Sequence, residues 1–331
     1  MDFDPCTIDA YASEPHYLSH VASVWRALPP ELRGNIYSPC RGVLDLDNSK
    51  RTNILKLKKN HLTLVASFKD LKYARRMSRQ IVLMEHGSGQ SYSNGSNYYV
   101  GGRDRACVAA TLMPNFQAAA RHTVAHPAIP AYVTGSIRVD ELRAATATRL
   151  FPVISFHWDC RIVPETRTAL PHYKSILASI KHEFSDLQGH GHPRIATLLK
   201  QEYTRAGIRF NGMLEDVASN ASVYIADNTS SMFEIAALDK PIVVLNAPWY
   251  RRDANHGGRF WRWADVGIQV NSPHNLIDAI HSALEDRTAL SDARRQIVNE
   301  VYPYQDSAAD KTVEAIHDIV NTYKSSLPAT G

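Results

Sequence analysis

Three hydroxyl residues in a row, Thr229-Ser230-Ser231, follow a strand expected over Val223–Ala226 and open a helix expected over 231–239. The first turn of a helix has unpaired N–H groups and a partial positive charge, so with these hydroxyl donors it is suited to hold a phosphate. Capping is the simpler alternative, because Ser231 and Glu234 fit a capping box, which needs no ligand. A capping box accounts for one hydroxyl but not for three consecutive ones.

A histidine stands at the end of a second expected strand, Ile81–Glu85. His86 is followed by Gly87-Ser88-Gly89, whose glycines let backbone approach a ligand closely. Its imidazole titrates near neutrality and can take a proton from an attacking hydroxyl. The alternative is a strand-end histidine that is satisfied by a hydrogen bond. The glycine segment has neither the G-K-[ST] ending of a P-loop nor the spacing of a dinucleotide fingerprint.

Short apolar runs that alternate with segments of helical period must position these residues. This alternation predicts parallel sheets flanked by helices. Further strands are expected at Leu62–Ser67, Tyr132–Gly135, Val153–Phe156, Ile242–Asn246 and Gly267–Val270, and further helices at 72–79, 105–121, 172–184, 274–286 and 307–323. We expect two Rossmann-like α/β domains, 1–148 and 149–331, and allow the C-terminal helix to pack back on the first. Two such sheets would face each other across a cleft, where ligands bind at the carboxyl ends of strands.

The composition is that of a globular protein large enough for two domains. The chain has 331 residues, 44% of them hydrophobic and 21% charged. Its longest apolar runs, such as Ile81–Met84, fall far short of the ~20 residues that a membrane-spanning helix needs. The acidic start has no apolar stretch typical of a secretory signal, and the four cysteines include no C-x-x-C pair. We therefore expect a cytoplasmic protein with no transmembrane segment and no structural zinc site.

Basic residues are concentrated in the first half of the chain. Residues 1–150 carry 19 Lys and Arg against 12 Asp and Glu, and the remainder carries 18 against 21. Within 50–79 there are ten basic residues and one acid, Asp70. A field of this sign favours an anionic partner such as a phosphate polymer, nucleic acid or lipid head group. The alternative is a solvated face of one strand and one helix.

Residues 227–234, Asp-Asn-Thr-Ser-Ser-Met-Phe-Glu, with Lys240-Pro241 behind them, resemble a family signature. The signature is the Asp-x-Ser-Ser-x-Met-Phe-Asp…Gly-Lys-Pro of the CDP-glycerol glycerophosphotransferases of teichoic-acid synthesis, which have the GT-B fold. Thr229 and Ser230 take the places of its paired serines. Four further segments resemble family motifs in the family's order: His86-Gly87-Ser88, Val133–Asp140, Gly191–Arg194 and Tyr302–Ala309.

The resemblance implies roles for individual residues. His86 would be the catalytic base, His192 would contact the diphosphate of the donor, and Glu234 is a candidate for the ribose hydroxyls. A polar loop is the alternative for His192. His157-Trp158 replaces a Thr-Trp of the family, and the arginine that follows there is displaced to Arg161, where it could neutralise the leaving diphosphate. Asp227 and the Gly87–Gly89 loop would lie beside the site, with domain 1–148 on the acceptor side and domain 149–331 on the nucleotide-donor side.

We therefore predict a metal-independent GT-B transferase that moves a nucleotide-diphosphate-activated group, glycerol phosphate or a sugar, onto an acceptor hydroxyl. The CDP- or UDP-linked donor is a substrate, and no cofactor is expected. One alternative is a nucleotide-sugar glycosyltransferase that acts on hydroxylated DNA bases or on another phage or bacterial polymer. The other is a non-catalytic GT-B-like protein that binds an anionic polymer through residues 50–79.

Overall fold

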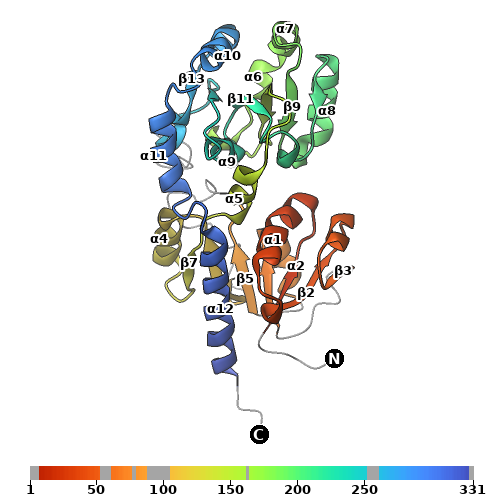
Figure 1. Ribbon diagram of the computed structural model, residues 1–331, viewed down its shortest axis with the longest axis vertical. Helices are drawn as coiled ribbons and strands as arrows, with labels where there is room; N and C mark the ends of the chain where they lie inside the picture. The colour runs from red at the N-terminus through yellow and green to blue at the C-terminus, as the bar shows by residue number, and fades with distance from the viewer. Residues whose placement is uncertain are drawn as a thin grey trace. The chain divides into compact units, whose positions relative to one another are not determined.

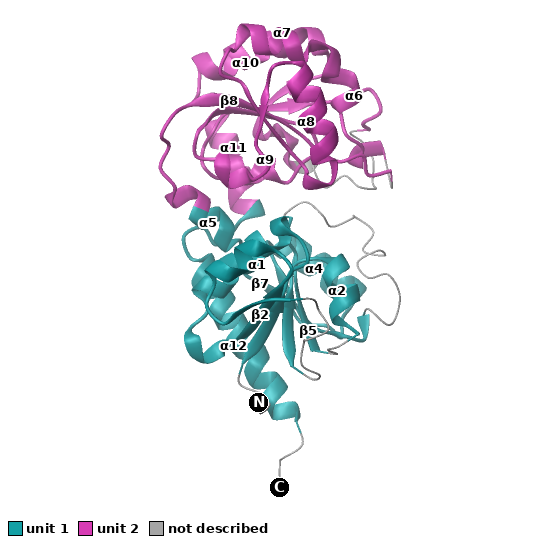
Figure 2. Ribbon diagram, turned by 90° about the vertical axis from the view of Figure 1, so that its right-hand side faces the viewer, with its two compact units in different colours: residues 1–141, 301–331 teal, residues 142–300 magenta. Residues whose placement is uncertain are grey.

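The computed structural model describes residues 7–52, 61–76, 80–87, 105–161, 164–251 and 261–327. The chain forms two compact units, which are coloured separately in Figure 2. Unit 1 contains residues 1–141 and 301–331, and unit 2 contains residues 142–300. The chain thus leaves the first unit seven residues before the boundary drawn from the sequence at 148/149, and its last 31 residues return to that unit.

Unit 1 is built on a seven-stranded parallel sheet with the order β3-β2-β1-β4-β5-β6-β7 (Figure 1). Its strands are β1 (Ile8–Tyr11), β2 (Arg33–Ser38), β3 (Ser49–Arg51), β4 (Leu62–Val65), β5 (Gln80–Met84), β6 (Val108–Met113) and β7 (Ala131–Val133). Its α-helices are α1 (Pro15–Ala27), α2 (Phe68–Ala74), α4 (Phe116–Ala125), α5 (Ile137–Ala144), which crosses into unit 2, and α12 (Ala308–Ser326).

The sheet of unit 1 is buried on both faces, as continuous apolar strands require. Leu62 and Leu64 of β4 belong to the same core cluster as the apolar residues of α1 and α12. Val65, the next residue along, points to the other face and joins the cluster that contains Leu71 of α2 and Ala118 of α4. Helices α1 and α12 therefore cover one face of this sheet, and α2 and α4 cover the other.

Unit 2 has a six-stranded parallel sheet with the order β10-β9-β8-β11-β12-β13. Its strands are β8 (Phe151–Phe156), β9 (Gln188–Gly191), β10 (Arg209–Phe210), β11 (Ala221–Ala226), β12 (Ile242–Leu245) and β13 (Ile268–Val270). Its α-helices are α6 (Leu170–Tyr173), α7 (Leu177–Glu183), α8 (Ala196–Arg205), α9 (Ser231–Ala236), α10 (Leu276–Glu285) and α11 (Ser291–Val301), whose last residue belongs to unit 1.

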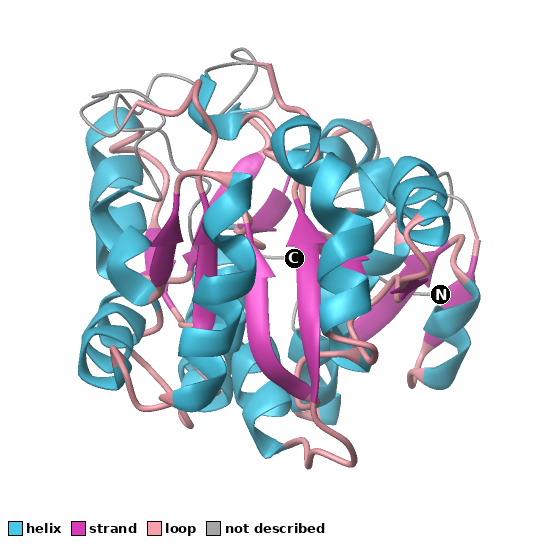
Figure 3. Ribbon diagram, turned by 90° about the horizontal axis from the view of Figure 1, so that it is seen from above, coloured by secondary structure: helices cyan, strands magenta, loops and turns pink. Residues whose placement is uncertain are grey.

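Both sheets have the strand order of doubly wound nucleotide-binding domains, with helices flanking the strands (Figure 3). The order reverses between β1 and β4 in unit 1 and between β8 and β11 in unit 2. In open sheets of this kind, ligands bind beside the carboxyl ends of the strands at such a reversal. The predicted two-domain, parallel α/β architecture is confirmed.

One predicted helix is wrong. Residues 105–121 were expected to form a single helix, but Val108–Met113 is the buried strand β6 and α4 begins only at Phe116. The alanines of Val-Ala-Ala-Thr-Leu-Met favour a helix locally, whereas pairing with β5 and β7 buries the segment in the sheet. Asn115 then caps α4, because its side chain accepts a hydrogen bond of 2.9 Å from the Ala118 N–H.

The described part of the chain contains neither a membrane-spanning helix nor a cluster of metal-binding side chains. None of its helices combines the length and the apolar character that crossing a membrane requires. Nor does any group of three or more His, Cys, Asp or Glu side chains among these residues lie where it could hold a metal ion.

Candidate functional site

The carboxyl ends of three neighbouring strands of unit 2 bring most of the predicted donor-binding residues together. His157 follows β8, His192 follows β9, and the segment Asp227–Ser231 follows β11. Strand β8 pairs with both β9 and β11, so the three loops leave the same edge of the sheet side by side. This edge includes the reversal of strand order between β8 and β11, where a ligand site is expected.

Aromatic rings make the His157 and His192 loops one cluster. The two imidazole centroids lie 4.9 Å apart, edge to face, and each ring also contacts Trp158. The Arg194 guanidinium lies 4.5 Å from the centroid of the Trp158 ring and is otherwise exposed. Arg194 therefore brings a positive charge to this edge.

Backbone groups fix the orientation of both histidines. Nδ1 of His157 lies 3.0 Å from the carbonyl oxygen of Trp158, which can only accept, so this nitrogen carries a proton. Nδ1 of His192 instead accepts a hydrogen bond of 3.2 Å from the Arg194 N–H, which puts the proton of a neutral ring on Nε2. Neutral His192 can therefore donate through Nε2 at the strand edge.

Gly191 allows the His192 loop to lie close to β8. A β-carbon at this position would lie 2.2 Å from Cδ1 of Leu199 and 2.8 Å from the carbonyl oxygen of Phe156. The His192 N–H donates to that same carbonyl at 2.9 Å. A larger residue than glycine would push these strands apart and displace His192.

Asp227 ties the segments around the site together. Its carboxylate accepts hydrogen bonds from the N–H groups of His157 (2.7 Å) and Ala169 (2.9 Å) and from the Thr168 hydroxyl (3.1 Å). Burial raises the pKa of Asp227 to about 7, although these hydrogen bonds act in the opposite direction. With an exposed fraction of 1%, Asp227 lies under the site and holds its loops in place.

The three hydroxyl residues lie at the start of α9, but they do not form the alternative capping box. Ser231 is the first helical residue, and Ser230 is the N-cap, whose side chain makes no capping hydrogen bond. The Ser231 hydroxyl lies 2.9 Å from that of Thr229 and 2.9 Å from that of Tyr224. Because α9 spans only Ser231–Ala236, hydroxyls and N–H groups, rather than a long helix, supply the donors here.

The structure gives Glu234 and Arg161 surroundings that the sequence did not indicate. Glu234 is buried, with 5% of its surface exposed. Arg161 has a side chain that is 80% exposed and donates to Asp159 at 2.9 Å. Asp159 also accepts from Arg167, so the displaced arginine of the motif belongs to a surface ion-pair network.

A charged pair that sequence reasoning missed stabilises the neighbouring loop. Glu165, 1% exposed, accepts hydrogen bonds from Nε (2.5 Å) and Nη2 (2.9 Å) of Arg251. Burial alone would raise the pKa of Glu165, but the hydrogen bonds from Arg251 hold it below its ordinary value. The pair connects the segment before α6 to the segment after β12, and no local motif marks it.

In unit 1, His86 lies beyond the carboxyl end of β5, packed against α1. Its ring centroid is 5.2 Å from that of Tyr17 and 5.7 Å from that of His20, edge to face in both cases. Gly87 is buried, and the predicted loop residues Ser88 and Gly89 lie outside the described residues. The i, i+4 spacing of His16 and His20 could have drawn attention to α1, but that helix was not predicted.

His20 is held between His86 and a permanent cation. Nη1 of Arg138, from α5, lies 3.1 Å from Nε2 of His20. Since arginine can only donate, Nε2 accepts and a neutral His20 carries its proton on Nδ1. Burial, followed by the charges of Arg138, His86 and His16, lowers the pKa of His20 well below its ordinary value.

The basic segment 50–79 is described in part. Lys56, Lys58, Lys59 and Arg79 lie outside the described residues. On and after α2, Lys72 and Arg76 are exposed, and the Arg76 guanidinium lies 5.8 Å from the centroid of the Tyr73 ring. Lys69 is instead engaged by Glu14.

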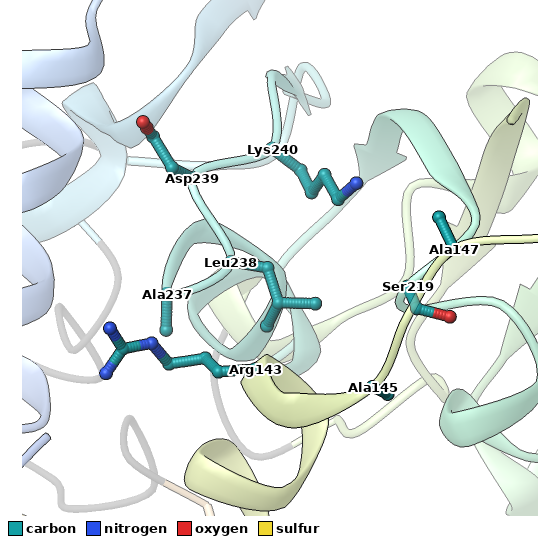
Figure 4. A pocket seen from close by; sticks show the side chains of 8 residues that line it. All are labelled: Arg143, Ala145, Ala147, Ser219, Ala237, Leu238, Asp239 and Lys240. Atoms are coloured by element: carbon teal, nitrogen blue, oxygen red, sulfur yellow. The ribbon is translucent and has the colours of Figure 1, made fainter. Parts of the chain in front are cut away.

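Unit 2 has a cavity of about 300 Å³ at the opposite edge of its sheet (Figure 4). Its lining comes from the end of α5 and the segment after it, from Ser219 before β11 and from the turn 237–240 before β12. Asp239 points away from Lys240 and accepts hydrogen bonds from Ser291 and Arg294. Because these residues precede the strands, the cavity is separate from the His157, His192 and Thr229 loops.

Known proteins resemble the chain in two ways. The sequence model of the CDP-glycerol:poly(glycerophosphate) glycerophosphotransferase family matches residues 185–318. The match contains both the His192 loop and the Asp227–Glu234 segment. The predicted family resemblance is confirmed. No curated protein matches the sequence.

Solved structures extend the likeness to the whole fold. A variant of the wall teichoic acid polymerase TagF soaked with CDPG has a TM-score of 0.62 and 10% identity, over 97% of this chain and 90% of that one. MnaA of S. aureus with UDP has a TM-score of 0.62 and 13% identity, over 95% of this chain and 97% of that one. The UDP-GlcNAc 2-epimerase of Neisseria meningitidis bound to UDP-GlcNAc has a TM-score of 0.53 and 12% identity, over 94% of this chain and 98% of that one. The fold is of the GT-B type, and together with the family match it indicates a glycerophosphotransferase-type transferase.

Proposed function

We propose that the chain transfers glycerol phosphate from CDP-glycerol to an acceptor hydroxyl without a metal ion. The observation that carries this proposal is the convergence of His157, His192 and Thr229–Ser231 at the reversal of strand order in unit 2. These loops offer donors for phosphate oxygens within the segment that the family model matches. The TagF polymerase soaked with CDPG, which has the same fold, supports this choice of donor.

At the donor site, charge neutralisation would come from side chains. Nε2–H of His192, the guanidinium of Arg194 and the hydroxyls of Thr229 and Ser230 are the groups assigned to the diphosphate. Arg161 can join only by leaving its contact with Asp159. Buried Glu234 is kept as the candidate for the ribose hydroxyls.

In the proposed reaction, the acceptor oxygen attacks the phosphorus that carries glycerol. A new P–O bond forms as the bond to the bridging oxygen breaks, and CMP leaves with the electron pair. His86, in unit 1, takes the proton of the acceptor hydroxyl as general base. Tyr17 and His20, both on α1, contact the ring of His86, which limits the orientations that it can adopt.

The acceptor is proposed to be an anionic polymer that contacts the basic residues of the 50–79 segment. Lys72 and Arg76 are the exposed cations of this segment on and after α2. Opposite charge would concentrate a polyphosphate near unit 1 and raise the rate of encounter. A phosphate polymer agrees with the matched family, whose description names poly(glycerophosphate). DNA is the competing acceptor.

A nucleotide sugar remains the second candidate donor. The UDP-bound MnaA structure matches as well as the TagF structure, with the same TM-score of 0.62. The test is a panel of CDP-glycerol, UDP-GlcNAc and UDP-glucose, with release of the nucleotide product measured in the presence of EDTA. If CDP-glycerol is the only donor of the panel that releases its nucleotide, as CMP, the proposal is supported. Release of UDP from a sugar donor instead supports the second candidate. If no donor binds or turns over, the result favours the non-catalytic alternative, a GT-B-like protein that binds an anionic polymer.

A further inference from the structure

A continuous row of buried polar side chains lies behind Thr229. The Thr229 hydroxyl contacts that of Ser231 at 2.9 Å, and Ser231 contacts the Tyr224 hydroxyl at 2.9 Å. The Tyr224 hydroxyl lies 2.9 Å from Nδ1 of His190, which is also 3.1 Å from the Ser155 hydroxyl. All five residues are at most 8% exposed.

The row connects three strands to the candidate donor site. Ser155, His190 and Tyr224 lie on β8, β9 and β11, and Tyr224 points to the opposite face from Val223 and Ile225. Tyr224 therefore meets Ser231 at the start of α9. Thr229, in the loop after β11, is the member of the row that lies next to the proposed diphosphate position.

Each hydroxyl has one proton, so no hydroxyl can donate to both of its neighbours in the row. If Nδ1 of His190 has no proton, Tyr224 donates to it, Ser231 donates to Tyr224, and Thr229 donates to Ser231. Thr229 then offers a ligand only lone pairs, which repel an anion. If Nδ1 carries a proton and donates it to Tyr224, the Tyr224 hydroxyl can donate to Ser231 and the Ser231 hydroxyl to Thr229, so that every bond reverses.

In the reversed order, Thr229 can only donate to a ligand. Its oxygen accepts from the Ser231 hydroxyl and also faces the Ser231 N–H at 3.4 Å, which occupies both lone pairs. The Thr229 proton is then directed away from the row, toward an acceptor in the site. Because the members polarise one another, the outward order strengthens this last donor.

We propose that His190, with its proton on Nδ1, and Tyr224 act as positioning residues that set this outward order, so that Thr229 donates to a diphosphate oxygen of the donor. The inference rests on the proposed function, because it assigns that diphosphate to Thr229. No proton leaves the row, and the step consists of hydrogen bonds alone. Neither residue touches the donor.

The first test is Tyr224→Phe, with Tyr173→Phe as the matched control. Tyr173 is equally buried in unit 2, and its hydroxyl lies 2.8 Å from the carbonyl oxygens of both Asn246 and Val270, outside the row. Calorimetric titration with CDP-glycerol should give about tenfold weaker binding for Tyr224→Phe and little change for the control. Equal affinities of the two variants would overturn the inference. If the wild-type protein itself binds no nucleotide donor, the proposed function is wrong. That outcome is distinguishable from a failure of the inference about Tyr224, in which the wild type binds the donor and the two variants bind it equally well.

A double-mutant cycle asks whether Tyr224 acts through Thr229. Thr229→Val removes the terminal donor, so adding Tyr224→Phe to it should cost no further affinity for CDP-glycerol. If the two losses multiply instead, Tyr224 does not act through the row. Thermal melting of each variant identifies any that fail to fold.

A spectroscopic measurement on the wild-type protein tests the inference even if Tyr224→Phe does not fold. ¹⁵N spectra of histidine-labelled protein, with His190 assigned by His190→Gln, distinguish protonated from bare Nδ1. With CDP-glycerol bound, Nδ1 of His190 should be protonated. A bare Nδ1 in the donor complex would refute the outward order.

Discussion

Nη1 of Arg138 lies 3.1 Å from Nε2 of His20, so the imidazole accepts a hydrogen bond from a side chain that is always charged. A proton on Nε2 would break this bond and place two cations in contact, beside His86. His20 therefore stays neutral where an ordinary histidine is half protonated.

His20 should accordingly show no protonation between pH 8 and pH 6 in an NMR titration. Its pKa in the fold is lowered, so its contribution to stability is complete above about pH 6.5 and is lost as the pH falls toward the folded value. Arg138→Gln should raise the pKa of His20, because one cause of the lowering is removed while burial remains. An unchanged titration would show that Arg138 does not control this ring.

Replacing His86 by Asn should lower the transfer rate by about 10²-fold or more, as expected for loss of a general base. Donor binding should persist, because the assigned donor contacts belong to unit 2. The control is His281→Asn, which changes a half-exposed histidine that pairs with Glu183. If His86→Asn retains full turnover, another group accepts the proton.

Asp227→Asn should destabilise the protein by about 1–3 kcal/mol. The two carboxylate oxygens now accept hydrogen bonds from two backbone N–H groups, and in the variant an amide NH₂ would face one of these donors. The pKa of Asp227 is raised to about 7 in the fold, so the native state binds a proton that the unfolded chain has released. The stability of the wild type should thus decrease as the pH rises from about 4 to 7, and this component should vanish in Asp227→Asn.

Urea unfolding of Asp227→Asn at several pH values measures both effects. Asp278→Asn, at an exposed position of α10, serves as the comparison and should unfold like the wild type. A variant Asp227→Asn that keeps wild-type stability and pH dependence would show that the three hydrogen bonds do not hold the loops.

Reversing the charge of Lys72 and Arg76 to Glu should weaken binding of a polyanion and reduce its dependence on salt. Two lost phosphate contacts reduce the slope of log affinity against log salt by about 2 for duplex DNA. Binding of fluorescent poly(glycerol phosphate) and of DNA should be measured across salt concentrations. The same reversal at Lys174 and Lys200, exposed on unit 2, is the control. If the wild type and both charge-reversed variants have the same slope of log affinity against log salt, Lys72 and Arg76 are ordinary solvated residues that do not contact the polyanion.

The sequence predicted the strand–loop–helix segment around Asp227 because its signal is local. A continuous apolar run, a polar turn and a segment of helical period lie within 20 residues. Each of these patterns favours one backbone conformation for its own segment. The strands β1, β2, β3, β9 and β10 were not predicted, and β6 was expected to be helical. Strand β9, Gln-Gly-His-Gly, is extended because β8 and β10 pair with it. Its two glycines allow close packing rather than favouring extended backbone.

Side-chain roles were less accessible from the sequence, since they depend on partners that are distant along the chain. The position of Arg161 suggested contact with a phosphate, but the pairing with Asp159 appears only in the folded chain. His20 acquires its character from Arg138, 118 residues away. Tyr224 looks like any strand residue until β9 places His190 beside it.

The return of residues 301–331 to unit 1 determines the order in which the chain can fold as it is synthesised. Ile316, Ile319 and Val320 of α12 fill the same core as β1 and β4, so unit 1 lacks part of its interior until α12 has left the ribosome. Unit 2, which is continuous in sequence, has all its strands by residue 270. The unit that is encoded second can therefore fold first, and the N-terminal sheet has to wait for its last helix.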